Sequence, residues 1–122
     1  MAIVNGYLID PEARTVTNVK VDVKDGSGIE DIYRHLGVDC FDLARINRHG
    51  DAVFVDDEGL LKDPEYFFAI EGYPEKLAGR GLVLGCDARG ETVSPVASFD
   101  SVKRGVKFYA RCLNILVQQE PA

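Results

Sequence analysis

The sequence predicts an α+β fold in which one well-defined helix packs on a mainly antiparallel sheet of hairpins. Several short segments alternate β-branched and polar residues, which is typical of half-buried strands. Residues 27–36 instead have the apolar spacing of an amphipathic helix. Turn residues separate neighbouring strand segments at short intervals, which favours hairpins. At 122 residues, the chain is expected to form a single domain over residues 1–122.

The first unit is predicted to be a β-hairpin. Residues 2–9 and 15–23 are rich in β-branched side chains, and the second segment alternates valines with charged or amide residues. Between them, Asp10 can start a turn and Pro11 fixes φ at the next position. We therefore expect two antiparallel strands joined at 10–14.

Residues 27–36 are predicted to form the principal helix. Ser27 is followed three residues later by Glu30, the pattern of a capping box. The apolar stripe consists of Ile29, Ile32, Tyr33 and Leu36. Gly37 supplies the left-handed residue that commonly ends a helix. This helix should bury one face against the sheet.

Beyond the helix, the apolar period returns to two. Strands are expected at 40–46, 51–55, 64–70 and 82–84. Three turns share one design, in which an Asx side chain caps the turn and a glycine with positive φ follows three positions later. They are 47–50, 56–59 and 87–90. Gly85, inside a strand, marks a bulge or a close backbone approach.

The C-terminal third is predicted to contain a short second helix at about 98–104, capped by Ser98 and ended by Gly105. Residues 106–112 then alternate apolar and polar side chains, which favours a strand, although a longer helix over 106–117 is the alternative. The resulting order β-β-α-β-β is compatible with a β-grasp-like sheet.

The net charge of −6 indicates the kind of partner. Nucleic acid binding requires a basic surface, so we expect no direct nucleic acid contact and favour a basic protein partner. Acidic residues concentrate between 51 and 75, where Lys62 is the only basic side chain. The acidic members are Asp51, Asp56, Asp57, Glu58, Asp63, Glu65, Glu71 and Glu75.

The sequence gives little sign of a membrane, a metal or a cofactor. No apolar stretch approaches the length of a bilayer span, and the N-terminus lacks a signal-peptide pattern, so a cytoplasmic protein without a membrane partner is expected. Cys40, Cys86 and Cys112 are widely spaced and form no CxxC, which favours free buried thiols. His35 and His49 are the only histidines, so a hydrolase based on a Cys–His pair is an alternative to a non-enzymatic role.

The glycines of residues 79–90 raise the question of a phosphate-binding loop. A dinucleotide fingerprint places the glycines after a strand and before a helix, but here two glycines precede the strand and no helix follows Gly85. Turn and strand geometry therefore accounts for these glycines better. A small-ligand or nucleotide-binding domain that uses this segment is kept as an alternative.

Residues 35–109 resemble a family of small uncharacterised proteins from bacteria, phages and mobile elements. The resemblance rests on the aromatic block at 66–74, on LAGRGLVLG at 77–85 and on GETVSP at 90–95. It implies a fold and a biological setting, and it assigns no catalytic residues.

Together these observations predict a non-enzymatic accessory protein of a phage or mobile element that acts by protein–protein binding. Its target would be a basic or nucleic-acid-binding host protein, including defence complexes, and its acidic segment would imitate the charge of DNA.

Consecutive aromatics on a strand point to opposite faces, so Phe67 and Phe68 should not share one core layer. The expected binding residues are Asp56, Asp57, Glu58, Asp63, Glu65, Tyr66, Phe68 and Tyr73.

Overall fold

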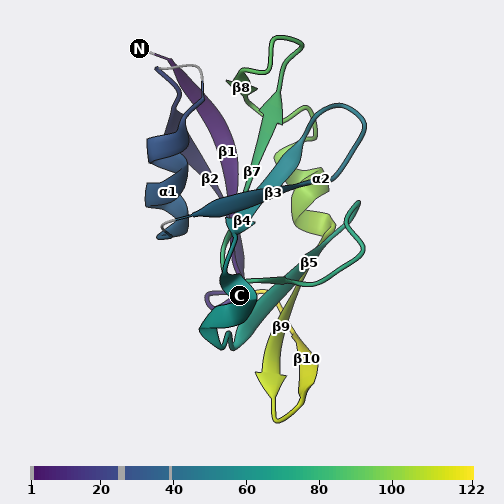
Figure 1. The fold of residues 1–122 in the computed structure, drawn as a ribbon. Coiled ribbons are helices and arrows are strands. Elements are labelled where there is room, and N and C mark those ends of the chain that lie inside the picture. Colours follow the sequence, from purple (N-terminus) through teal and green to yellow (C-terminus); the bar gives the residue numbers. More distant parts are fainter. Residues whose placement is uncertain (1, 25–26, 39) are drawn as a thin grey trace.

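Ten strands form two antiparallel sheets in the computed structural model, which describes residues 2–24, 27–38 and 40–122 (Figure 1). The first sheet contains β1 (Ile3–Asp10), β2 (Thr15–Asp22), β3 (Phe41–Arg45), β4 (Ala52–Asp56), β7 (Gly81–Cys86) and β8 (Thr92–Val93). The second contains β5 (Tyr66–Ile70), β6 (Leu77–Ala78), β9 (Val106–Cys112) and β10 (Ile115–Gln119). The helices are α1 (Ile29–Leu36), α2 (Phe99–Arg104) and the 3₁₀ turn η1 (Gly59–Lys62). The predicted α+β class is confirmed.

Strand β7 is the centre of the first sheet, whose order is β2-β1-β7-β4-β3. It lies antiparallel to β1 on one side and to β4 on the other, with Val83 opposite both Tyr7 and Val53. Its residues Leu82, Val83 and Leu84 are fully buried, as expected for a strand covered on both faces. The predicted order β-β-α-β-β is present, and β7 from later in the sequence separates its two hairpins.

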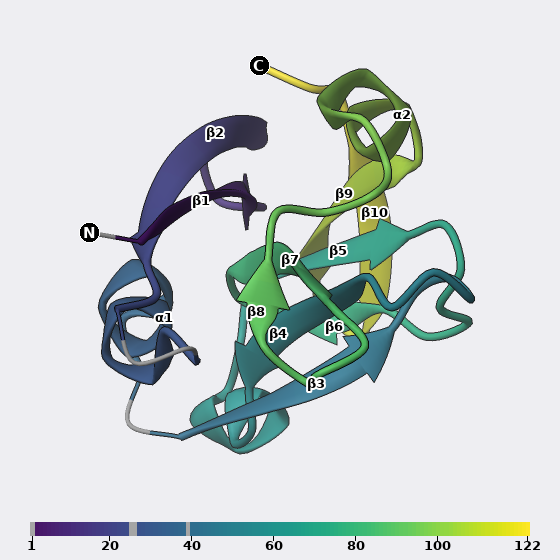
Figure 2. The same cartoon turned by 90° about the horizontal axis from the view of Figure 1, so that it is seen from above.

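Two hydrophobic cores lie on opposite faces of this sheet. On one face, α1 covers β7 and its neighbours, so Ile32 and Leu36 pack with Leu82 and Leu84. On the other face, the second sheet and α2 complete a core around Val53, Val83 and Phe68. Figure 2 shows α1 and α2 on different sides of the first sheet. The period of two along β7 therefore sends alternate side chains into different cores.

Both predicted helices are present, with a difference at the start of α1. Its N-cap is Gly28 in the left-handed conformation, so the helix begins one residue later than a Ser27 capping box would place it. Gly37, with φ of 68°, ends the helix as expected. In α2, the Ser98 hydroxyl accepts a hydrogen bond from Ser101 N at 3.1 Å, which confirms the predicted cap.

Two of the three turns have the predicted design. Asn47 and Asp87 each accept backbone hydrogen bonds within their own turns, and Gly50 and Gly90 have φ of 101° and 83°. The turn after β4 differs. Asp56 accepts from Glu58 N as expected, but Gly59 begins η1 and lacks a positive φ, so the chain leaves the first sheet instead of forming a hairpin.

The region over 106–117 is a hairpin of β9 and β10, which decides between the strand and helix alternatives in favour of strands. Its two-residue turn is Leu113-Asn114, with Leu113 at φ of 59°. A leucine at positive φ is unusual, so Asn114 is the ordinary turn residue of this turn and Leu113 gives no signal of it. Strand β10 was missed in the sequence analysis.

The buried carboxylate of Asp51 joins segments that are far apart in the sequence. Asp51 is fully buried and accepts hydrogen bonds from Val96 N, Ala97 N and Asn47 Nδ2, each at 2.9 Å. The β3–β4 turn is thereby fixed to the segment that leads into α2. Three donors compensate for the cost of removing the carboxylate from water.

Gly85 and Tyr7 complete the surroundings of Asp51. A Cβ at Gly85 would lie 2.6 Å from Ser94 O and 3.2 Å from Asp51 Oδ1, which confirms the predicted close backbone approach. The Tyr7 hydroxyl donates to Ala97 O at 2.7 Å. Burial, and secondarily the Asp51 charge, raise the pKa of Tyr7 above its ordinary value of 10.0. The carboxylate therefore also favours the neutral phenol that donates this hydrogen bond.

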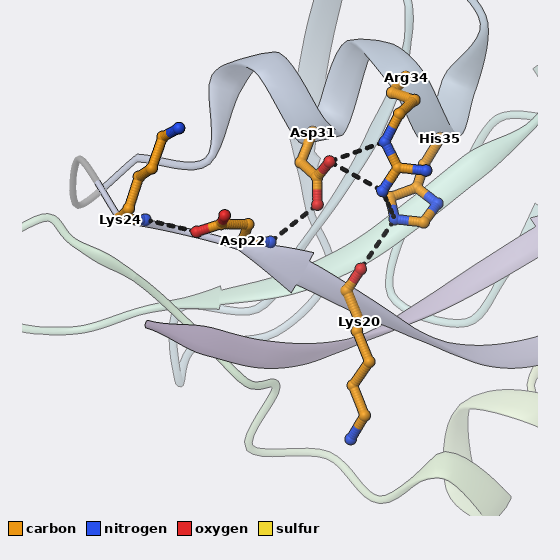
Figure 3. A network of polar contacts seen from close by, with 6 residues as sticks. All are labelled: Lys20, Asp22, Lys24, Asp31, Arg34 and His35. Atoms are coloured by element: carbon orange, nitrogen blue, oxygen red, sulfur yellow. Dashed lines mark hydrogen bonds and ion pairs between the residues drawn. The ribbon is translucent and has the colours of Figure 1, made fainter. Parts of the chain in front are cut away.

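Side chains of α1 form hydrogen bonds with backbone groups of the edge strand β2 (Figure 3). Asp31 Oδ2 accepts from Asp22 N at 2.8 Å, and Lys20 O accepts from His35 Nε2 at 2.9 Å. Burial opposes ionisation of Asp31, but hydrogen bonds from Asp22 N and Arg34 outweigh it and lower the pKa of Asp31 below its ordinary 3.8. The helix thus covers the sheet and also bonds two backbone groups at the C-terminal end of its β2 edge.

Replacing Asp51 by alanine is expected to lower the free energy of unfolding by about 3 kcal/mol, because it leaves buried donors without an acceptor. The measurement is urea unfolding followed by circular dichroism. Asp57→Ala, which removes an exposed carboxylate, is the control and should change stability by less than about 0.5 kcal/mol. Equal effects of the two substitutions would contradict the anchoring role of Asp51.

Stability supplied by Asp31 should depend on pH. Because the pKa of Asp31 is lowered by folding, its stabilisation is present above 3.8 and is lost as pH falls through the folded pKa. The difference in unfolding free energy between wild type and Asp31→Asn should therefore be largest near neutral pH and shrink in acid. Glu30→Gln, at an exposed position in the same helical turn, is the control. A difference that persists at about pH 2 contradicts this account.

Candidate functional site

A surface groove of about 220 Å³ lies between the β3–β4 hairpin, η1 and the segment that leads into β6. We call it the acidic groove, because four carboxylates and one lysine line it. They are Asp42, Asp56, Asp57, Glu75 and Lys76. Three separate parts of the chain supply these charges, so folding adds Asp42 to carboxylates that come from the acidic segment 51–75.

The acidic groove also has an exposed apolar component. Leu43, Leu60 and Leu61 line it with exposed fractions of 53%, 73% and 85%. Apolar side chains that gather at a surface and are bordered by charges commonly mark a protein–protein contact. The groove thus combines apolar contact area with a negative rim.

Internal contacts modify the charge of this rim. Asp56 forms a 2.8 Å ion pair with Lys62, and its other oxygen accepts from Glu58 N at 2.9 Å. Asp57 is exposed at the turn before η1. Lys76 Nζ lies 4.7 Å from the centre of the Tyr109 ring, in a cation–π contact. Asp57 and Glu75 are therefore the better placed carboxylates for a charged partner.

The predicted binding residues divide between this groove and other places. Asp56, Asp57 and Tyr73 line the acidic groove, and Glu58 is exposed in the adjoining turn. Asp63 lies at the end of η1 and pairs with Arg111. The remaining three residues, Glu65, Tyr66 and Phe68, lie outside the groove.

Phe68 requires a correction, because its side chain is fully buried and cannot contact a partner in this conformation. It belongs to the core between the two sheets. Phe67 is also buried, with 7% of its surface exposed, in register with Ala78 and Tyr109 on the neighbouring strands. The second sheet therefore buries a side chain on each face here, and neither phenylalanine forms a surface patch.

Several groove residues were missed by the sequence analysis. Asp42 and Leu43 belong to a strand that was predicted only as a structural element, and Leu60 and Leu61 were expected to follow a hairpin turn. The adjacent leucines in a segment rich in acids were the available signal. Their exposure depends on η1, which replaces the predicted hairpin.

The glycine-rich segment is placed differently from a phosphate loop. Gly81 to Gly85 are buried in β7, while Gly79 and Arg80 line a separate hollow of about 210 Å³. Asp10, Glu12 and Glu65 also line that hollow. Three carboxylates against one arginine disfavour a phosphate group.

The exposure and contacts of the cysteines and histidines bear on the alternative of Cys–His catalysis. Cys40, Cys86 and Cys112 are free as predicted, but they are exposed rather than buried. His35 is engaged with the edge of β2, and His49 is exposed in the β3–β4 turn. Among residues 2–24, 27–38 and 40–122, no cluster of three or more His, Cys, Asp or Glu side chains has the arrangement of a metal site.

The part of the chain that the structure describes contains no helix with the length and apolarity needed to cross a membrane. No protein-family model matches the sequence, and no solved structure matches it. The chain is 34% identical over 89 residues to "Uncharacterized protein y4iR" of Sinorhizobium fredii (strain NBRC 101917 / NGR234). The match covers 73% of this chain and 53% of the relative, so the chain spans about half the length of that protein. The chain is thus similar to an uncharacterised bacterial protein.

Proposed function

We propose that this protein is a non-enzymatic binding protein whose acidic groove captures a basic protein partner. The observation that carries the proposal is the coincidence of negative charge and exposed leucines in one groove. The carboxylates select a basic surface and speed its approach, while apolar contact supplies affinity.

The preferred partner is a protein that itself binds nucleic acid, such as a component of host defence, and the preferred setting is a phage or mobile element. Such partners carry basic surfaces, which the net charge of −6 complements. Three exposed leucines lie among the carboxylates of the groove, whereas the phosphate backbone of DNA has no comparable apolar groups. They are Leu43, Leu60 and Leu61. We therefore favour a mixed charged and apolar interface, in which imitation of DNA charge is one component.

Reversing the charge of the acidic groove should abolish partner binding. In the double variant Asp57→Lys with Glu75→Lys, like charges would face the basic partner, which costs affinity and slows association. The measurement is affinity capture from the cells that encode the protein, followed by mass spectrometry and by titration of the captured partner at two salt concentrations. Wild-type binding should weaken as salt increases, because rim charges are screened.

The matched control is Glu12→Lys with Glu91→Lys, which makes the same change in net charge at two exposed positions outside the groove. This variant should retain the captured partner. Loss of binding in both double variants would indicate a response to net charge alone. Retention of the partner by the groove variant would show that the acidic groove is not the interface.

A further inference from the structure

In the described part of the chain, four strands end the two sheets, and the two-residue β8 is a further short edge that pairs only with β7. An open edge is a template for pairing with another strand. The four strands that end the sheets are β2 and β3 in the first sheet and β10 and β6 in the second. Soluble proteins usually protect such edges with charges, caps or short strands. These four edges are not protected equally.

Three of the edges carry a recognisable protection. The side chains of Asp31 and His35 form hydrogen bonds with backbone groups of β2. In β3, the carboxylate of Asp42 accepts from the backbone of Leu43 at 2.8 Å, and the strand also carries Arg45. Strand β6 has only two residues, Leu77 and Ala78.

Strand β10 differs from these three edges. Residues 113–119, LNILVQQ, contain no charged side chain, although 28% of the chain is charged. Leu113, Ile115 and Val117 are exposed by 90%, 65% and 40%. The alternating pattern of an antiparallel ladder turns every second pair of backbone groups of β10 away from β9. Strand β10 therefore combines exposed apolar side chains with backbone groups that point away from β9.

The position of β10 also makes it accessible. The β9–β10 hairpin projects from the body of the molecule (Figure 1), and β9 separates β10 from β5. Ile115 and Leu116 lie opposite Cys112 and Arg111, beyond the last residues of β9 that pair with β5. The acidic groove is formed by other elements, so this edge is independent of the proposed partner site.

We propose that β10 pairs with β10 of a second copy in antiparallel orientation, so that two four-stranded sheets join into one of eight strands. With the twofold axis at Val117, Ile115 faces Gln119 and Leu116 faces Gln118, so no like charges oppose each other. A charge-free edge is where two copies of net charge −6 approach with least repulsion. Within residues 113–119 the same edge offers a basic partner no carboxylate, which favours an identical strand as its occupant.

The oligomeric state tests this proposal. Light scattering under reducing conditions, over a wide range of concentration, should give twice the 13.4 kDa chain mass at high concentration. Val117→Lys places a charge on the edge and should restore the single-chain mass. Val96→Lys introduces the same side chain at a position that is 64% exposed elsewhere and should leave the dimer intact.

Hydrogen exchange locates the contact, because amides of β10 should gain protection in the dimer and lose it in Val117→Lys. Circular dichroism checks that the variant is folded, and Ile115→Lys replaces it if it is not. A wild-type chain that stays monomeric at every concentration overturns the proposal. A dimer that persists in a folded edge variant, or one without added protection in β10, overturns it equally.

Discussion

The carboxylate of Asp51 holds together parts of the fold that no strand pairing connects. It lies immediately before β4 and accepts hydrogen bonds from the backbone of Val96 and Ala97, which lead into α2. Because α2 packs on the core between the two sheets, the position of this helix depends on a carboxyl group that is buried without exposure to water. Gly85 lets the backbone near Ser94 approach closely enough for these hydrogen bonds to form.

The fold was largely predictable where the sequence carries local signals. Local patterns predicted several elements correctly. They are the alternation in β1 and β2, the apolar stripe of α1, and the Asx-glycine turns at 47–50 and 87–90. The failures arose where the residue type does not indicate the local conformation. Gly59 resembles the other turn glycines, but its segment forms η1, and Leu113 adopts a positive φ that its side chain does not announce.

The candidate site was also only partly predictable. Asp56, Asp57 and Tyr73 were found because acids and aromatics are concentrated in one segment. Asp42 comes from another strand, and only pairing of β3 with β4 brings it to the groove. Phe68 could not be distinguished from an exposed aromatic by alternation, because the second sheet buries residues on both faces at this point.

The central place of β7 has a consequence for how the chain folds during synthesis. The hairpins β1–β2 and β3–β4 are complete by residue 56, but they share no direct ladder, and β7 is the strand that pairs with both of them. The first sheet therefore cannot assemble until about two-thirds of the chain has left the ribosome, and until then each hairpin has an unpaired edge that β7 later occupies. Contacts such as that between Tyr7 and Val83 span most of the sequence, which predicts slow folding relative to a helical protein of this length.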